Sequence, residues 1–171
     1  MDNDAETAAL NLRHALGEEE AARWLSPGPN MNGRQKQKQR RWAIINLWRP
    51  VGDVVRQWPL GLVDARDVVK GRDTAPIYTL ANYKSHFTAL KPRDHFRFYY
   101  VSDLAPDEAI LFVDFDSRCH QGRLHEEGGE QMMSETPVVG MAHGAFHDHN
   151  APERCPRRRS IEVRSLVLYD D

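Results

Sequence analysis

Two short stretches in the last third of the chain carry residue types that could do chemistry together. His143 has the small neighbours Ala142, Gly144 and Ala145, and the last two leave room beside the imidazole for a metal ion. A lone histidine in such a setting is more often structural than a ligand, so both interpretations stay open. Further along, Arg158 and Ser160 stand at the head of an alternating run. Together the two stretches could hold a metal ion and an anion.

The spacing of Arg158 and Ser160 suits a site for a carboxylate when it is taken together with the candidate metal ligand His143. Strand alternation would place both on one face, together with Glu162 and Arg164. An arginine that faces the interior needs an anionic partner, because burying an unpaired charge is very costly. The planar guanidinium binds a carboxylate through two parallel hydrogen bonds, and a nearby hydroxyl adds another. A basic start to a surface strand would give the same pattern and is the alternative.

The histidine content adds a further hint of metal chemistry. The chain contains 8 histidines, and four of them fall between His125 and His149. His147 and His149 could form a His-rich metal tract. Because Asp148 and Asn150 are interleaved with them, we interpret this stretch as an exposed loop.

Length and composition limit the class of protein. The 171 residues, 40% hydrophobic and 28% charged, suit one soluble domain with its own core. A net charge of −2 gives no overall field that would attract nucleic acid. No apolar run approaches the roughly 18 residues of a membrane span, and the acidic start lacks the apolar region of a secretory signal. We therefore expect a cytoplasmic protein without a membrane partner, in which Cys119 and Cys155 are free thiols.

Periodicity predicts a mainly β protein with one N-terminal helix. Ala8, Leu12 and Leu16 recur at helical spacing and predict a helix over residues 4–25, which Asp4 could cap. About seven short strands are predicted at residues 42–50, 60–64, 77–80, 96–101 and 109–115, and from near His143 and Ser160. Without a βαβ rhythm, these strands favour an antiparallel fold, and residues 118–140 are expected to form a mobile insertion.

A basic run from Arg34 to Arg41 is the one feature that could bind nucleic acid. The run is short, the chain as a whole is not basic, and no second basic-aromatic stretch supports it. We therefore interpret it as a solvated segment that leads into the first strand. A salt-dependent gel shift would separate the two interpretations.

Seven short motifs resemble, in order and spacing, those of the asaB-type hydroxylase/desaturase family, also described as gibberellin-desaturase-like or cephem-methoxylase-like. The motifs are Ile45–Pro50, Trp58–Leu60, Phe98–Tyr100, Pro106–Ala109, Phe115–Ser117, His143–Phe146 and Ser160–Arg164. Together they span most of the chain. The resemblance implies an Fe(II)/2-oxoglutarate-dependent oxygenase on a double-stranded β-helix, of the jelly-roll or cupin-like type.

The resemblance also implies roles for individual residues. His143 matches the distal metal histidine of the family, and Asp4 matches the carboxylate ligand of its His-x-Asp motif. Arg158 would bind 2-oxoglutarate together with Ser160, and Arg164 is a nearby second candidate. We expect His143 and Arg158 to face the same cavity, and Asp4 to approach His143.

One departure from the family pattern bears on activity. The His-x-Asp motif aligns with Asp2-Asn3-Asp4, so Asp2 stands where the family has a histidine. We expect residues 1–171 to form a single domain, the C-terminal portion of such an enzyme, with the N-terminal strands of a partial double-stranded β-helix missing. The predicted function is hydroxylation or desaturation of a small molecule of secondary metabolism with Fe(II), 2-oxoglutarate and O₂. The alternative is a catalytically dead binding protein that descends from such an enzyme.

Overall fold

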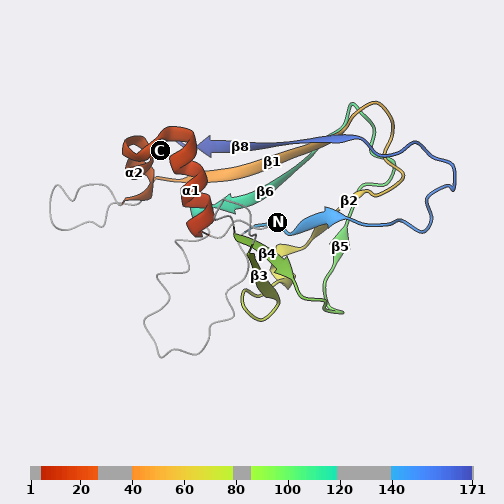
Figure 1. Ribbon diagram of the computed structural model, residues 1–171, viewed down its shortest axis with the longest axis horizontal. Coiled ribbons are helices and arrows are strands. Elements are labelled where there is room, and N and C mark those ends of the chain that lie inside the picture. Colours follow the sequence, from red (N-terminus) through yellow and green to blue (C-terminus); the bar gives the residue numbers. More distant parts are fainter. Residues whose placement is uncertain (1–4, 27–39, 79–85, 119–139, 171) are drawn as a thin grey trace.

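The computed structural model describes residues 5–26, 40–78, 86–118 and 140–170, and Figure 1 shows their arrangement. These residues form two α-helices, one short 3₁₀ helix and eight strands. In chain order they are α1 (Ala5–Leu16), α2 (Glu18–Leu25), β1 (Trp42–Pro50), β2 (Leu60–Val63), η1 (Ala65–Asp67), β3 (Thr74–Tyr78), β4 (His86–Leu90), β5 (Phe98–Tyr99), β6 (Ile110–Asp116), β7 (His143–Ala145) and β8 (Ser160–Leu168).

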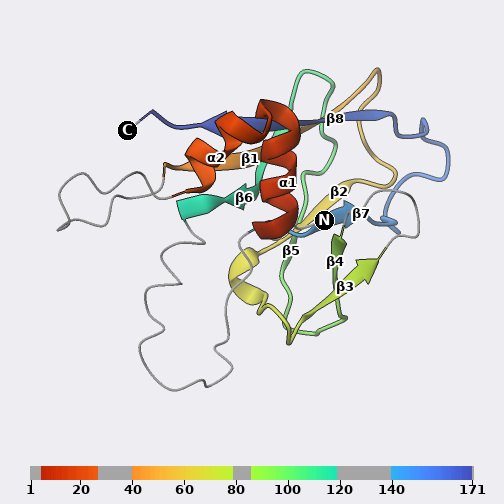
Figure 2. The same ribbon diagram turned by 60° about the vertical axis from the view of Figure 1, so that its left-hand side comes forward.

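The predicted single helix over residues 4–25 is wrong, because the chain forms two helices that are separated by Gly17. This glycine has φ 81° and ψ 164°, outside the helical region, and the left-handed φ suits a residue without Cβ. Leu12 of α1 and Trp24 of α2 are both buried in one cluster with Trp42 and Ile44 at the start of β1. The helices therefore cover one end of the sheet to which β1 belongs, as Figure 2 shows. The predicted cap, Asp4, lies outside the described residues.

The larger sheet has the strand order β6-β1-β8 and is antiparallel throughout. β1 is rich in aromatic and β-branched residues, as the sequence predicted, and it is buried along most of its length. It pairs with β8 over nine positions, from Trp42 opposite Leu168 to Pro50 opposite Ser160. Because this register is long and continuous, it fixes which side chains of β1 and β8 share a face.

A bulge interrupts the pairing of β1 with β6. Ile44 lies opposite Phe115, whereas the next residue, Ile45, lies opposite Val113. The extra residue on β6 is Asp114, and its side chain is fully buried. Bulges change the direction in which side chains point. This bulge directs the Asp114 carboxylate toward the interior of the protein.

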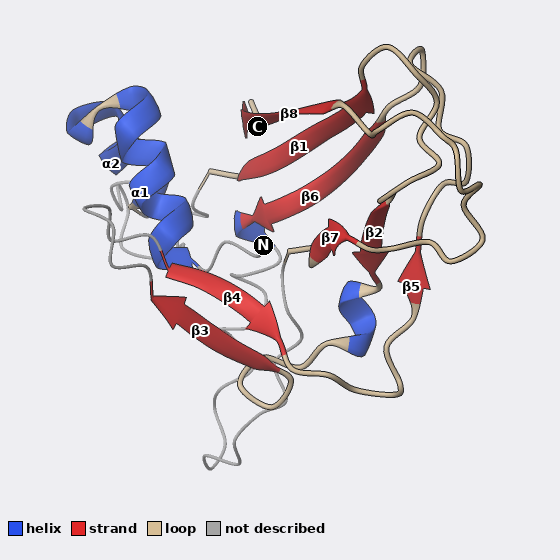
Figure 3. Cartoon of the chain, turned by 45° about the vertical axis from the view of Figure 1, so that its right-hand side comes forward, coloured by secondary structure: helices blue, strands red, loops and turns tan. Residues whose placement is uncertain are grey.

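The smaller sheet has the order β5-β2-β7, and β3 pairs with β4 in a separate two-stranded unit, visible in Figure 3. β4 was not predicted, and its pairing with β3 raises the strand count to eight. The strand predicted over residues 96–101 is reduced to Phe98–Tyr99. Its shortening follows from Phe96, which is buried in a separate cluster with Val63 and Val68 instead of continuing the ladder.

The two three-stranded sheets pack against each other. Trp48 of β1 and Phe112 of β6 share a buried cluster with Leu60 of β2, and Met141 packs on it just before β7. This contact brings the start of β7 close to the inward face of β1, β6 and β8. No helix in the described residues is long and apolar enough to cross a membrane.

Candidate metal and carboxylate site

The His143 imidazole is held between the two sheets. The backbone of His143 lies opposite Leu62 in the smaller sheet. Its ring stacks at 4.5 Å, between centroids, on Phe112 of the larger sheet, and only 9% of its side chain is exposed. Nδ1 lies 2.9 Å from the carbonyl oxygen of Met141, and because a carbonyl can only accept, Nδ1 carries the hydrogen.

Burial sets the protonation state of this ring. Desolvation lowers the pKa of His143 below its usual 6.5 and outweighs the opposing effects of the Met141 carbonyl and Glu162. The neutral ring with a hydrogen on Nδ1 presents a lone pair on Nε2, the form in which histidine binds metal ions. A backbone carbonyl bound to the other ring nitrogen is the usual support of a metal-binding histidine.

A carboxylate of the larger sheet lies next to this nitrogen. The Oε1 atom of Glu162 is 3.9 Å from Nε2 of His143. It also accepts a hydrogen bond of 2.9 Å from Nδ2 of Asn46, whose side chain is fully buried. Glu162 is therefore positioned by β1 and faces β7.

The network continues along the same face to an ion pair between the exposed Arg164 and a buried carboxylate. Nε of Arg164 lies 3.4 Å from Oδ1 of Asn46, and its Nη2 lies 3.1 Å from Oδ2 of Asp114. The bulge in β6 thus supplies the carboxylate that pairs with Arg164. Arg164 is already engaged by a buried anion, so it is poorly placed to bind a second carboxylate.

Arg158 lies on the same face and remains available to an anion. Its guanidinium carbon is 5.6 Å from the ring centroid of Trp48, the residue opposite Glu162 in the register of β1 and β8. Among the residues that the structure describes, Arg158 makes no ion pair. Ser160 is half-buried at the start of β8, two residues from Glu162. The neighbouring Arg159 is exposed, with its guanidinium 3.8 Å from Asp53, as strand alternation predicts.

The structure thus brings together some of the predicted residues and adds others. His143 and Arg158 both lie at the inward face of the larger sheet. His143 lies next to Glu162, and the guanidinium of Arg158 lies over the ring of Trp48. Asp4 lies outside the described residues. The proximity of Glu162 to His143 was not predicted, although strand alternation placed Glu162 on the same face as Arg158. The one polar residue in the centre of β1, Asn46, was the available signal for a polar network.

Other predicted candidates take no part in this site. His147 and His149 are exposed, as predicted; their rings contact each other, and the ring of His147 also contacts Trp58. Cys155 is a free thiol, whereas Cys119 and most of residues 118–140 lie outside the described residues. In the described part of the chain, no three His, Cys, Asp or Glu side chains gather closely enough to hold a metal ion by themselves.

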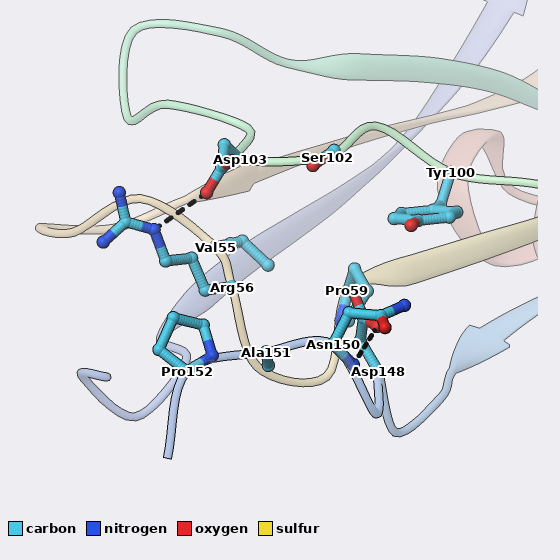
Figure 4. Close-up of a pocket in the computed structure, with 10 residues that line it drawn as sticks. All are labelled: Val55, Arg56, Pro59, Tyr100, Ser102, Asp103, Asp148, Asn150, Ala151 and Pro152. Carbon is cyan, nitrogen blue, oxygen red and sulfur yellow. Dashed lines mark hydrogen bonds and ion pairs between the residues drawn. The ribbon is translucent and has the colours of Figure 1, made fainter. Parts of the chain in front are cut away.

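A cavity of about 300 Å³ lies apart from these residues, where loops meet beyond the ends of β2, β5 and β7. Figure 4 shows its lining, in which Arg56 pairs with Asp103 at 2.8 Å and the backbone of Asn150 donates to Asp148. Neither His143 nor Arg158 lines it. It was not predicted, and it contributes nothing to the metal and carboxylate site.

Comparison with known proteins places the chain in a family. The family described as an oxidoreductase/YMDC permease-like domain matches residues 2–168. Oxidoreductase R1 of Phoma sp. is 32% identical over 99% of this chain and 50% of its own length. Hydroxylase/desaturase asaB of Aspergillus flavus is 34% identical over 77% of this chain and 57% of its own. The chain therefore spans about half the length of the curated relatives that it matches.

A solved structure supports the same assignment. The iron and alpha-ketoglutarate-dependent endoperoxidase NvfI superposes with a TM-score of 0.69 at 29% identity, covering 99% of this chain and 51% of its own. The predicted mainly β fold of double-stranded β-helix type is confirmed, with two N-terminal helices in place of one. The resemblance to the asaB-type hydroxylase/desaturase proteins is confirmed too. The chain belongs to the oxidoreductase/YMDC permease-like domain family.

Proposed function

We propose that this chain is an oxidoreductase of secondary metabolism that hydroxylates or desaturates a small molecule with Fe(II), 2-oxoglutarate and O₂. The observation that carries the proposal is the shared face of His143 and Arg158. A neutral imidazole lies over Phe112 on this face, and a guanidinium without an ion pair among the described residues lies over Trp48. One group suits a metal ion and the other a carboxylate.

The described residues fit part of an iron site. His143 would supply nitrogen through Nε2, with its orientation set by Met141, and Asp4 is the carboxylate ligand that the family resemblance implies. Bound iron would supply the activation of O₂ with 2-oxoglutarate as the co-substrate, since protein side chains lack redox chemistry of this kind. The part of this chain is to hold the ligands in place against Trp48 and Phe112, which are both buried.

The co-substrate would be bound by Arg158 and Ser160. A guanidinium without a competing carboxylate can form two parallel hydrogen bonds to the distal carboxylate of 2-oxoglutarate, and the Ser160 hydroxyl adds a third. Arg164 is the weaker candidate because Asp114 already occupies it. Strand spacing places Ser160 about 7 Å from Glu162 along β8, so the clamp lies one strand repeat away from the carboxylate that stands next to His143.

The net charge and the basic run bear on which other partners the chain has. We propose a cytoplasmic protein of one domain, with a small molecule as its partner and without nucleic-acid or membrane partners. Arg41, the last residue of the basic run, pairs with Asp116 at 2.7 Å and stacks on Tyr169. Because Arg41 is engaged within the fold, it is less available to bind nucleic acid, and this favours the interpretation of the run as a segment that leads into β1.

The test measures binding of 2-oxoglutarate and release of succinate with Fe(II) and ascorbate. We expect Arg158→Gln to weaken 2-oxoglutarate binding by about tenfold or more, in line with the loss of a charged hydrogen bond. Arg158→Lys should recover only part of it, because an ammonium lacks the planar fork. Arg159→Gln, one residue away on the opposite face, is the matched control and should bind like the parent.

A catalytically dead descendant is the second candidate. It is favoured by Asp2 in the histidine position. Because of this substitution we expect Fe(II) to bind weakly and succinate to be released slowly. Binding of 2-oxoglutarate without any succinate release, even with an Asp2→His change, would favour the dead descendant. Arg158→Gln binding as tightly as the parent would contradict the proposed clamp.

A further inference from the structure

We propose that two copies of this chain pair through β8, edge to edge and antiparallel, across a two-fold axis beside Val163. The larger sheet has the order β6-β1-β8, and among the described residues β8 pairs only with β1. Figures 1 and 3 show β8 as the outermost strand of that sheet. An edge strand presents a row of backbone N–H and C=O groups with which another chain can pair. The inference concerns an interaction surface and goes beyond the proposed oxidoreductase activity.

The two edges of the larger sheet differ in how well they could accept a further strand. β6 carries a bulge at Asp114, and a bulge breaks the regular ladder and protects an edge. β8 pairs with β1 over nine positions without a shift in register, and it contains no proline. Ile161 and Val163, on the outer face of β8, are 50% and 47% exposed. A long, regular edge strand with exposed apolar side chains is the kind of edge at which chains associate.

The outer face of the sheet favours a second copy as the partner. Leu47 of β1 lies opposite Leu111 of β6 on one side and opposite Val163 of β8 on the other. These three side chains form an apolar row across the sheet that ends at β8. Two-fold pairing centred on Val163 places it opposite the partner's Val163, so the rows of the two copies join end to end. The exposed apolar surface at this seam is then removed from water, which favours association.

The charges on the inward face of β8 select the same register. Centring the axis on Val163 places Glu162 opposite the partner's Arg164, and Arg164 opposite the partner's Glu162. The two side chains are 35% and 43% exposed, so each can meet a charge across the seam. Centring on Glu162 or on Arg164 places like charges directly opposite each other, which is destabilising. Because Arg164 already pairs with Asp114, these charges serve mainly to exclude other registers, and the apolar row and the backbone hydrogen bonds supply the affinity.

Sedimentation velocity over about a hundredfold range of protein concentration measures the equilibrium between monomer and dimer. We expect the parent chain to form a reversible dimer. Val163→Lys places two lysines opposite each other at the axis and should raise the dissociation constant of the dimer by about tenfold or more. Leu111→Lys is the matched control, because it adds the same charge at an exposed position on the other edge strand. It should leave the dissociation constant unchanged.

Disulfide crosslinking tests the register, in a chain whose Cys119 and Cys155 are replaced by serine. Directly opposite residues of antiparallel strands have Cα atoms about 4.5–5.5 Å apart, within the range that a disulfide bridges. Val163→Cys should therefore form a crosslinked dimer with itself. Ile161→Cys and Ser165→Cys should not crosslink alone, but they should crosslink when the two chains are mixed, because the proposed register places these positions opposite each other.

Three results would overturn the inference. A monomer at every concentration would mean that no second copy covers the edge of β8. A dimer that Leu111→Lys separates and Val163→Lys leaves intact would place the interface elsewhere. Crosslinking of Ile161→Cys with Val163→Cys, in place of the mixture with Ser165→Cys, would mean a register centred on Glu162 and contradict the charge argument. Near-UV circular dichroism checks the fold of each variant, and none of these readouts depends on binding of a metal ion or 2-oxoglutarate.

Discussion

The Arg164 guanidinium lies 3.1 Å from Oδ2 of Asp114, a carboxylate that is fully buried at the bulge of β6. The pair joins the two edge strands of the larger sheet across β1, with Asn46 between them. It therefore supports the face on which His143, Glu162 and Arg158 lie. Its contribution is structural, and it makes Arg164 a weaker candidate than Arg158 for the proposed carboxylate clamp.

The first prediction concerns this pair. Arg164→Ala should lower the free energy of unfolding by about 2 kcal/mol, because it removes a charged hydrogen-bond partner from a buried carboxylate. Arg159→Ala removes an exposed arginine that makes no contact with Asp114. It should change the free energy of unfolding by less than about 0.5 kcal/mol. Urea unfolding of both variants checks the difference. Equal unfolding midpoints would show that the Arg164–Asp114 contact carries no stability.

The second prediction is a pH dependence that originates at His143. Burial lowers the pKa of this residue in the folded protein, so the unfolded chain takes up the proton at a higher pH than the folded one. The stability that depends on the neutral His143 ring is fully present above pH 6.5. It decreases as the pH falls from 6.5 toward the lowered pKa, because the unfolded chain takes up the proton first. Urea midpoints measured between about pH 5 and pH 7.5 should therefore decline on the acid side.

The control uses a histidine in the loop that follows β7. His143→Gln should flatten the pH dependence between pH 6.5 and the lowered pKa, because the titrating group is removed. His147→Gln replaces an exposed ring and should leave the slope unchanged. An unaltered slope in His143→Gln would mean that other groups set the acid sensitivity.

The sequence predicted the strands of the larger sheet well because their signals are local. β1, β6 and β8 combine β-branched and aromatic residues with period-two alternation, and alternation alone placed Arg158 and Glu162 on one face. The proximity of Glu162 to His143 could not be predicted from alternation. It depends on the packing of the two sheets, which brings β7 to the inward face of β8, and on Asn46 behind it. Such contacts between distant segments leave no periodic signal.

The remaining errors have equally specific causes. The break between the two helices depends on one backbone angle at Gly17 within an otherwise helical pattern. The short β5 reflects the burial of Phe96 in a different cluster, which competes with its high strand propensity. In both places tertiary structure or a single glycine overrides the local preference.

The third prediction tests the conformation of Gly17. Gly17→Ala should lower the free energy of unfolding by roughly 1 kcal/mol, because φ is 81° and a Cβ is disfavoured there. Crowding is not the cause, since an added Cβ at Gly17 meets no atom within 4 Å. Gly144→Ala is the matched control, because its Cβ also meets open space but its φ is ordinary. Chemical unfolding should show a loss for Gly17→Ala only, and equal losses would contradict the argument.

The fourth prediction concerns the fully buried Asp73 beside β3. Its carboxylate accepts from Arg72 at 2.8 Å, from Arg93 at 3.1 Å and from the backbone of Val69 at 2.9 Å. The hydrogen bond from Arg72 is the largest cause that holds the pKa of Asp73 far below its usual 3.8. The folded protein therefore keeps this carboxylate ionised at a pH where the unfolded chain protonates it.

The sign of the effect follows from this shift. The stability that Asp73 contributes is fully present above pH 3.8 and is lost as the pH falls from there toward the lowered pKa. Asp73→Asn should unfold at clearly lower urea concentration at pH 7, and it should lose less stability than the parent on acidification below pH 4. Asp94→Asn replaces an exposed aspartate next to Arg93 in the chain and should behave like the parent at both pH values. If Asp73→Asn shows the parent's acid sensitivity, the Arg72 and Arg93 contacts do not stabilise the ionised form.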